Sequence, residues 1–288
     1  MAIGFYKAGL KLGDTVLLGV SNCLEVVVIL LALNKLGVIS KWFDVRAGEK
    51  DIEDYANDSN CRYLIAFDLL LPKIQRILDN TKLEQVLIIY PTDELPIMMQ
   101  ALYLPKAKRL PRDVRYVRFK DFIKSVEDDS DIPCVAFDKN RPSIMIQSSG
   151  TTGKPKVRVH SDFSATSCTK TLTYCDLPMG EGKTLLDALP PWIAYALGQA
   201  IIYPLSIGTR VKLCPTFEPN MVMDNLGTFT ISFAAPFHYR YIREHFGELF
   251  KKQRAGLSTL ECLVSGGDKI SAEENKELEK ILGTVLIN

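Results

Sequence analysis

Short apolar runs alternate with amphipathic stretches along almost the whole chain, and this alternation constrains the fold more than any other feature. The first run, at 15–20, precedes an apolar helical stretch at 22–37, with Asn22 as the expected N-cap and Gly37 placed to end the helix. Similar runs recur at 38–43, 62–67, 85–90, 143–147, 184–189, 209–214, 229–235, 260–265 and 284–288. Buried strands separated by helices are typical of βαβ units. We therefore predict an α/β fold of mainly parallel sheets with flanking helices.

The stretches between these runs predict helices at 49–58, 70–80, 162–175 and 271–282, the last with Ser271 and Glu274 in a capping-box arrangement. Between 91 and 142 the pattern weakens, and we expect irregular, exposed connections. This stretch holds a basic patch that we interpret as a solvated surface loop, because no aromatic stacking platform accompanies it. Its members are Lys106, Lys108, Arg109, Arg112, Arg115 and Arg118. We expect two α/β subdomains, at 1–140 and 141–288.

Charge and cysteine content exclude several classes of protein. The 35 basic and 34 acidic residues balance to a net charge of +1, which gives no electrostatic reason for a nucleic-acid partner. Seven cysteines without a C-x-x-C pair indicate reduced thiols in a cytoplasmic protein. His238 and His245 are too far apart to bind one metal ion, and the longest apolar run is too short to span a membrane. We expect neither a protein metal site nor a membrane span, and the oligomeric state stays open.

One polar loop, SSGTTGKPK at 148–156, follows the apolar run 143–147. Gly150 and Gly153 allow a tight turn whose successive N–H groups form an anion-binding concavity. The hydroxyl groups and the lysines add donors, and each hydrogen bond to a charged oxygen contributes roughly 1.5–3 kcal/mol. We therefore expect the loop, carried by the second subdomain, to bind a polyphosphate.

The loop is not a common P-loop, since its glycines are only three residues apart and Pro155 follows the lysine. A second stretch at 179–187, MGEGKTLLD, has the G-K-T ending, but Leu177 occupies the position of the first P-loop glycine. We interpret this stretch as a turn before a strand.

The loop, followed by His160 and Ser161, resembles the phosphate-binding signature of the adenylate-forming enzymes. These include acyl- and aryl-CoA synthetases, firefly luciferase and the adenylation domains of peptide synthetases. Four further segments resemble the same family in the same order, so that the resemblance covers essentially the whole chain. They are 9–39, 187–219, 228–239 and 259–271.

The resemblance implies a two-step reaction: a carboxylate attacks Mg-ATP to give an acyl-adenylate, and a thiol, usually that of coenzyme A, then takes the acyl group. Gly266 and Gly267 would let the backbone lie against adenine. The loop would hold the β- and γ-phosphates, with Thr151 and Lys154 stabilising the charge that develops on the leaving pyrophosphate. The phosphate-binding residues would be Ser148, Ser149, Gly150, Thr151, Thr152, Gly153, Lys154 and, at the edge, Lys156. The acid pocket would include Trp192, Tyr195 and Phe237.

Plainer interpretations stay open. The three aromatic residues would be core residues in most sequences, and Gly266–Gly267 would usually be an ordinary turn. Val157 stands where the family usually has glycine, so that the exit of the loop is expected to differ. Ile193 stands where the family often has histidine. The acid that any one subfamily activates is therefore not carried over to this chain.

The chain ends before the family's aromatic-Gly-x-x-Glu motif, which supplies a magnesium-binding carboxylate, and before its lid domain. We therefore expect the N-terminal portion of an acyl-CoA synthetase, with little adenylation by this portion alone. Two alternatives are a non-catalytic nucleotide-binding remnant and an adenylation domain that loads a carrier protein.

Overall fold

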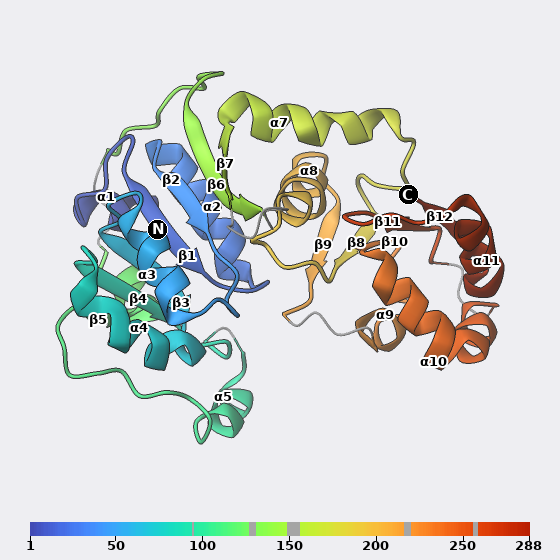
Figure 1. The fold of residues 1–288 in the computed structure, drawn as a ribbon, viewed down its shortest axis with the longest axis horizontal. Helices are drawn as coiled ribbons and strands as arrows, with labels where there is room; N and C mark the ends of the chain where they lie inside the picture. The colour runs from blue at the N-terminus through green and yellow to red at the C-terminus, as the bar shows by residue number, and fades with distance from the viewer. Residues whose placement is uncertain (94, 127–130, 149–155, 216–219, 256–258) are drawn as a thin grey trace. The chain divides into compact units, whose positions relative to one another are not determined.

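The computed structural model describes residues 1–288 apart from 94, 127–130, 149–155, 216–219 and 256–258, and apart from the side chains of 99, 148, 168–169 and 253–255. The chain forms two compact units, Met1–Ser164 and Ala165–Asn288 (Figure 1). This division lies after the expected boundary at residue 140. The reason is that β6 (Pro142–Ser148) and β7 (Lys156–Ser161), expected in the second subdomain, are hydrogen-bonded into the sheet of the first unit.

The first unit is built on a seven-stranded sheet with the order β5-β4-β3-β1-β2-β6-β7. Neighbouring strands are parallel except for β7, which runs antiparallel to β6 at one edge of the sheet. The remaining strands are β1 (Thr15–Gly19), β2 (Ile39–Trp42), β3 (Tyr63–Phe67), β4 (Gln85–Ile89) and β5 (Tyr116–Arg118). The predicted mainly parallel α/β architecture is confirmed for this unit.

The helices of the first unit follow the strands in the predicted alternation. They are α1 (Ala2–Lys7), α2 (Leu24–Leu36), α3 (Glu49–Asn57), α4 (Leu71–Ile77), α5 (Ile97–Tyr103) and α6 (Phe119–Lys124). Gly37 ends α2 in the left-handed conformation, at φ 69°, as predicted, but the N-cap is Cys23 rather than Asn22. The expectation of only irregular structure between 91 and 142 was wrong, because α5, β5 and α6 are too short to produce a clear hydrophobic period.

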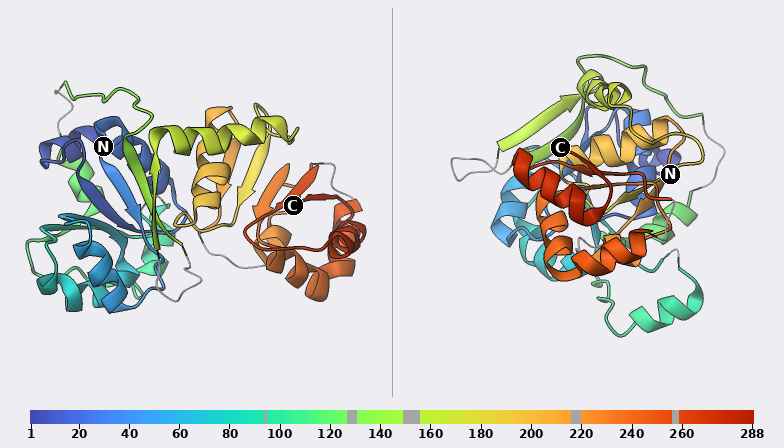
Figure 2. Two further views of the ribbon diagram at one scale, coloured as in Figure 1. Left: turned by 45° about the horizontal axis from the view of Figure 1, so that its top comes forward. Right: turned by 90° about the vertical axis from the view of Figure 1, so that its right-hand side faces the viewer.

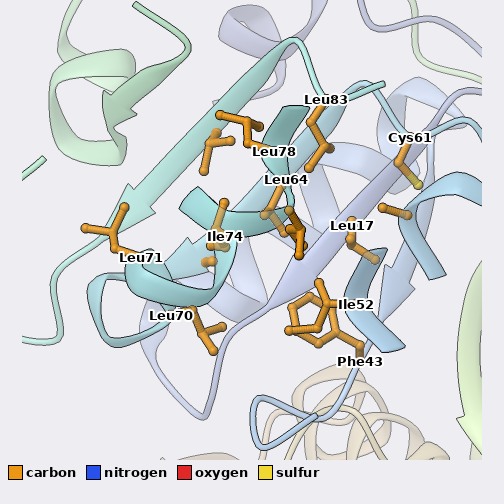
Figure 3. Close-up of a cluster of buried hydrophobic side chains, with 14 of the residues drawn as sticks. Leu17, Phe43, Ile52, Cys61, Leu64, Leu70, Leu71, Ile74, Leu78 and Leu83 are labelled. Atoms are coloured by element: carbon orange, nitrogen blue, oxygen red, sulfur yellow. The ribbon is translucent and has the colours of Figure 1, made fainter. Parts of the chain in front are cut away.

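One hydrophobic cluster joins the sheet of the first unit to α3 and α4 (Figure 3). Leu17 and Leu64 project from the strands, Ile52 from α3 and Ile74 from α4, and all four are almost fully buried. The opposite face of the sheet is also buried, since Val16 and Leu18 alternate with Leu17 and are equally inaccessible. Burial on both faces explains why the strand sequences are continuous apolar runs rather than alternating ones.

A lysine, Lys41 of β2, is fully buried between these layers. Its Nζ donates hydrogen bonds to the carbonyl oxygen of Tyr55, at 2.5 Å, and to Oγ of Ser59, at 2.8 Å, and lies over the Tyr55 ring. Burial lowers the pKa of this ammonium group. The lysine thus ties the end of α3 to the centre of the sheet.

A buried ion pair closes the base of the β6–β7 hairpin. The pairing runs from Ser148 opposite Lys156, at the loop end, to Pro142 opposite Ser161. Directly beyond it, Nη2 of Arg141 lies 2.6 Å from Oδ2 of Asp162, and the amide of Asp162 donates to the carbonyl oxygen of Arg141 at 2.9 Å. Only 10% of the Arg141 side chain and 4% of the Asp162 side chain are exposed. This pair fixes the register of the two strands that flank the polar loop.

The second unit is built on a five-stranded sheet with the order β12-β11-β10-β8-β9, in which all neighbours are parallel. The strands are β8 (Thr184–Asp187), β9 (Arg210–Leu213), β10 (Ile231–Ala234), β11 (Cys262–Ser265) and β12 (Val285–Ile287). Each lies within a predicted run. A parallel sheet places the carboxyl ends of all five strands at one edge.

Helices cover both faces of this sheet (Figure 2). Leu186 and Leu263 pack with α10 and α11 on one face, whereas Leu185 and Cys262 pack with the π-helical segment Ala196–Ile202 on the other. The helices are α7 (Asp162–Lys170), which runs across the division between the units, α8 (Tyr203–Ser206), α9 (Asn220–Asp224), α10 (Pro236–Ala255) and α11 (Ala272–Leu282). Ser271 caps α11 by accepting a hydrogen bond from the amide of Glu274 at 3.1 Å, as predicted.

The first turn of α10 contains a buried histidine, His238, which is 1% exposed. Its Nδ1 lies 3.1 Å from the amide nitrogen and 3.0 Å from the carbonyl oxygen of Ala235, the residue before the helix. Burial lowers the pKa of this imidazole from 6.5 to about 4, because the charged form is poorly solvated there.

We expect replacement of Asp162 by Asn to lower the free energy of unfolding by about 3–5 kcal/mol, because it leaves the Arg141 guanidinium buried without its counter-charge. Urea unfolding of the purified protein measures this change. The matched control is Glu84→Gln, which breaks the exposed Glu84–Arg62 pair and should cost about 1 kcal/mol or less. Equal costs for the two substitutions would contradict a closing role for Asp162.

We expect His238 to make stability fall as the pH is lowered from about 6.5 to about 4. Over that window the unfolded chain binds a proton at this histidine and the folded protein does not, so that folding loses up to about 3 kcal/mol. Urea unfolding at several pH values measures the slope for the wild type and for His238→Gln. The variant should show a shallower slope below pH 6.5, and identical slopes would exclude this origin.

Candidate functional site

The polar loop lies at the tip of the β6–β7 hairpin. β6 ends at Ser148 and β7 begins at Lys156, so that the loop leaves the sheet at the carboxyl end of β6. In parallel α/β sheets this edge is where ligands bind. The residues Ser149, Gly150, Thr151, Thr152, Gly153 and Lys154 lie outside the described residues, as does the side chain of Ser148.

The strand that leaves the loop is an exposed edge strand. Lys156 and Val157 are exposed, and the extended backbone of β7 suits the β-branched Val157 where the resembling family has glycine. His160 is half-buried further along β7, and its Nδ1 lies 3.3 Å from Oγ of Ser164. Burial and the neighbouring charge of Arg158 lower the pKa of His160.

The second G-K-T stretch is a turn before β8, as predicted. Gly180 and Gly182 both have positive φ, at 120° and 79°, and the amide of Lys183 donates to the carbonyl oxygen of Gly180 at 3.2 Å. The ammonium group of Lys183 is paired with Glu261 at 2.5 Å. This lysine therefore has a structural partner of its own.

In the second unit, the predicted adenine-binding glycines follow β11 at the carboxyl edge of the sheet. The amide of Gly266 donates to the carbonyl oxygen of Ala234, at the end of β10, at 3.1 Å. A Cβ atom at residue 266 would lie only 2.8 Å from Cζ of Tyr195. Gly267 has a φ of 87°, and no described atom lies within 4 Å of the position of its Cβ. The first glycine thus admits the tyrosine ring, and the second leaves the backbone accessible.

Tyr195 contacts both Gly266 and β10. Its ring stacks on Phe233 of β10, with ring centroids 5.9 Å apart and an interplanar angle of 12°. Its hydroxyl group is buried and has no hydrogen-bond partner among the described residues. Burial raises the pKa of this hydroxyl, and the charge of Asp187 adds to the effect. The hydroxyl oxygen lies 3.1 Å from the position that a Cβ atom at residue 266 would take, at the carboxyl edge of the sheet.

The other two predicted pocket residues follow neighbouring strands. Trp192 lies after β8 and is half-buried, and Phe237 is the second residue of α10, shortly after β10. Phe237 is 47% exposed and stacks on the ring of His238 at a centroid distance of 4.0 Å. The interpretation of Phe237 as a core aromatic residue does not hold. The structure brings Tyr195 into contact with Gly266, and Trp192 and Phe237 emerge at the same edge.

Two polar residues at this edge were not predicted as site residues. Asp187, the last residue of β8, is fully buried, and its Oδ1 accepts a hydrogen bond from the amide of Leu189 at 2.9 Å. Ser265 ends β11, and its hydroxyl group is buried without a hydrogen-bond partner in the described structure. An acidic residue at the end of the run TLLD is a signal that could have identified Asp187.

Two further searches of the structure cover the described residues only. Within these, no group of three or more His, Cys, Asp or Glu side chains is arranged to hold a metal ion. No helix in the same part of the chain combines the length and the apolar character needed to cross a membrane.

Comparisons with known proteins give one family and a consistent set of relatives. The long-chain-fatty-acid–CoA ligase of Bacillus subtilis is 24% identical and matches 97% of this chain and 50% of its own length. The 4-coumarate–CoA ligase 2 of Oryza sativa subsp. japonica is 23% identical over 98% of this chain and 47% of its own. The chain therefore spans about half the length of these curated relatives.

The fold is shared with solved structures of CoA ligases. An anthranilate CoA ligase in complex with anthranoyl-AMP superposes with a TM-score of 0.80 at 21% identity, covering 99% of this chain and 52% of the other. The family described as "AMP-binding enzyme" matches residues 1–288. The chain belongs to the AMP-binding enzyme family.

Proposed function

We propose that the protein takes part in the ATP-dependent activation of a carboxylic acid as an acyl-adenylate, followed by transfer of the acyl group to coenzyme A. The observation that carries the proposal is the SSGTTGKPK loop at the tip of a register-fixed hairpin, at the carboxyl edge of a parallel sheet in an AMP-binding chain. The relatives named as CoA ligases support both half-reactions.

In this proposal the loop binds the β- and γ-phosphates of ATP. Its backbone amides and the hydroxyl groups of Ser149, Thr151 and Thr152 donate hydrogen bonds, and Lys154 supplies the positive charge. Lys156 lies at the start of β7, at the edge of the loop. Charge on the leaving pyrophosphate is thereby stabilised without a covalent intermediate.

The carboxyl edge of the second sheet supplies the nucleoside and acid sites in this proposal. Gly266 and Gly267 offer accessible backbone, and the Tyr195 hydroxyl group is buried beside them without a hydrogen-bond partner among the described residues. Both features fit a planar ligand that brings its own hydrogen-bond acceptor. Trp192, Tyr195 and Phe237 would enclose the acid, and an aryl or medium-length acyl group suits such aromatic walls.

Two cofactors have no residues assigned to them. Mg²⁺ would accompany ATP, but the described residues offer no set of three ligands that fits a metal ion, and no step is assigned to it. Coenzyme A is the proposed acceptor because the curated relatives are named as CoA ligases.

Replacing both Thr151 and Lys154 by Ala tests the loop. We expect the double variant to bind ATP roughly 100-fold more weakly, because one charge-assisted hydrogen bond and one neutral one are lost. Isothermal titration calorimetry of the 288-residue chain measures this affinity. Lys183→Ala is the matched control, since it removes a lysine from the other G-K-T sequence and should leave ATP affinity unchanged.

The same proteins distinguish the possible activities. Carboxylate-dependent exchange of pyrophosphate into ATP, screened over a panel of acids, tests adenylation by this chain and by the full product of its gene. Thioester formation with coenzyme A, but not with a carrier protein, supports the proposed acceptor. ATP binding by the gene product without exchange for any acid would indicate a nucleotide-binding remnant. Undiminished ATP affinity in the double variant would exclude the loop as the phosphate site.

Replacing Tyr195 by Phe tests the second sheet edge. The free energy of unfolding should change by less than about 0.5 kcal/mol, because the structure describes no hydrogen-bond partner for the lost hydroxyl group. Affinity for the activated acid or nucleotide should nevertheless fall several-fold, which calorimetry with ATP and with a non-hydrolysable acyl-adenylate analogue measures.

Tyr239→Phe provides the opposite pattern as a control. The Tyr239 hydroxyl donates to the carbonyl oxygen of Val264 at 2.9 Å inside the core, so its loss should cost about 1 kcal/mol of stability without affecting ligand affinity. A Tyr195→Phe variant that loses stability and keeps its full affinity would contradict the assignment of Tyr195 to the ligand site.

A further inference from the structure

Helix α5 presents an apolar surface to solvent. Ile97 and Met98 are 83% and 82% exposed, and Leu102 and Leu104 are 72% and 70% exposed. Side chains of this size are seldom so accessible together on a soluble protein, and a cluster of them marks an interaction surface. We refer to residues 95–112, which contain α5 and the basic segment after it, as the α5 segment.

The exposure of this surface follows from the way in which α5 is held. Oη of Tyr103 donates a hydrogen bond to Oδ1 of Asp68 at 2.9 Å, and the amide of Lys108 donates to Oδ2 of the same carboxylate at 2.9 Å. Asp68 is fully buried in the body of the first unit. Within the segment, Nε2 of Gln100 donates to the carbonyl oxygen of Leu95 at 2.8 Å. The two hydrogen bonds to Asp68 therefore attach the segment to the body of the first unit.

The polar contacts and the apolar surface lie on different faces of α5. Gln100 and Tyr103 are three residues apart and share one face. The other face carries Ile97 and Met98 and, four residues after each of them, Ala101 and Leu102. The amphipathicity is inverted relative to a core helix, whose apolar face packs inward. In Figure 1 and the right view of Figure 2, α5 projects away from the sheet of its unit.

Positive charge adjoins the apolar surface. Lys106, Lys108, Arg109 and Arg112 are exposed, and none forms an ion pair with a residue that the structure describes. Residues 95–112 contain no acidic side chain. The two remaining members of the basic patch differ, since Arg115 is paired with Asp79 and Asp113, and Arg118 with Asp93. Within the basic patch, the four members that form no ion pair with a described residue thus all lie in the α5 segment.

We propose that the α5 segment docks the protein onto the surface of an anionic phospholipid membrane. The exposed side chains of Ile97, Met98, Leu102 and Leu104 enter the boundary between headgroups and acyl chains, and the four cations contact lipid phosphates. An exposed apolar helix face beside basic residues is the composition of interfacial membrane segments. This docking is peripheral, and it is independent of the proposed enzymatic function.

Charge selects this occupant. An apolar surface alone would suit another protein equally well. Four exposed cations that form no ion pair with a described residue, in a segment that contains no acidic residue between 95 and 112, match a surface of dense negative charge. The interpretation of these basic residues as a solvated surface loop does not explain why the adjoining apolar side chains are exposed. Membrane docking accounts for both features together.

Co-sedimentation of the 288-residue protein with vesicles tests the proposal. We expect binding to phosphatidylcholine vesicles that contain about a quarter phosphatidylglycerol, weaker binding at high salt, and little binding to phosphatidylcholine alone. Met98→Gln/Leu102→Gln and Lys106→Gln/Lys108→Gln/Arg109→Gln should each lower the partition coefficient at least about tenfold. Thermal unfolding should be unchanged, because these side chains are exposed.

Matched controls change the same chemistry elsewhere on the first unit. Leu24→Gln/Leu31→Gln removes two other exposed leucines, and Lys11→Gln/Lys124→Gln/Lys139→Gln removes three other exposed cations. Both should bind vesicles as the wild type does. Insertion is read directly from Met98→Trp, whose added fluorescence should shift to the blue with anionic vesicles, whereas that of Leu31→Trp should not.

Several results would overturn the proposal. One is that the protein shows no preference for anionic over neutral vesicles. A second is that a control variant loses as much binding as the α5 variants do. A third is that the charge variant loses binding and the apolar variant does not, which would indicate adsorption by charge alone. Concentration-dependent self-association that Met98→Gln/Leu102→Gln abolishes, without vesicle binding, would instead assign the surface to a second copy of the chain.

Discussion

The buried pair of Arg141 and Asp162 is the interaction on which the candidate phosphate site depends. Arg141 directly precedes β6 and Asp162 directly follows β7, so both residues lie at the base of the hairpin. Their contact combines an ion pair with a backbone hydrogen bond. Hairpin register is otherwise set by the connecting loop, and a long polar loop sets it weakly. The contact between Arg141 and Asp162 instead holds the two strands together at the end of the pairing away from the loop.

The second sheet positions its candidate ligand groups in a different way. Its three central strands, β8, β10 and β11, are buried on both faces, and Tyr195, Gly266 and Phe237 lie at their carboxyl ends. The absence of a side chain at Gly266 admits the tyrosine ring, and the ring then shields its own hydroxyl group from water. The contact with Gly266 thus orders the Tyr195 ring, whose hydroxyl group has no hydrogen-bond partner in the part of the chain that the structure describes.

In the α5 segment a polar group is buried and apolar groups are exposed. The buried carboxylate of Asp68 accepts hydrogen bonds from Tyr103 and from the amide of Lys108. These bonds hold the helix with its apolar side chains in solvent. A short helix with its apolar face in water gains little stability from hydrophobic contacts. The hydrogen bonds to Asp68 hold this helix in place instead. The inferred membrane contact and the family's ligand chemistry therefore rest on separate parts of the sequence.

The amino-acid sequence by itself determined the strands other than β5 and β7, the helices α2, α3, α4, α7 and α11, the α/β class and the identity of the polar loop. These depend on local periodicity and on residue types at fixed spacing, which a single chain displays directly. The sequence analysis did not identify α5, β5 or α6, which are too short for a period to be visible. It also missed the 20-residue helix α10, and it placed the N-cap of α2 one residue too early. The division between the units, the contact of Tyr195 with Gly266 and the pairing of Arg141 with Asp162 were decided only by the tertiary structure. Each joins residues that are distant in sequence, and such contacts are set by how sheets and helices pack rather than by local preference.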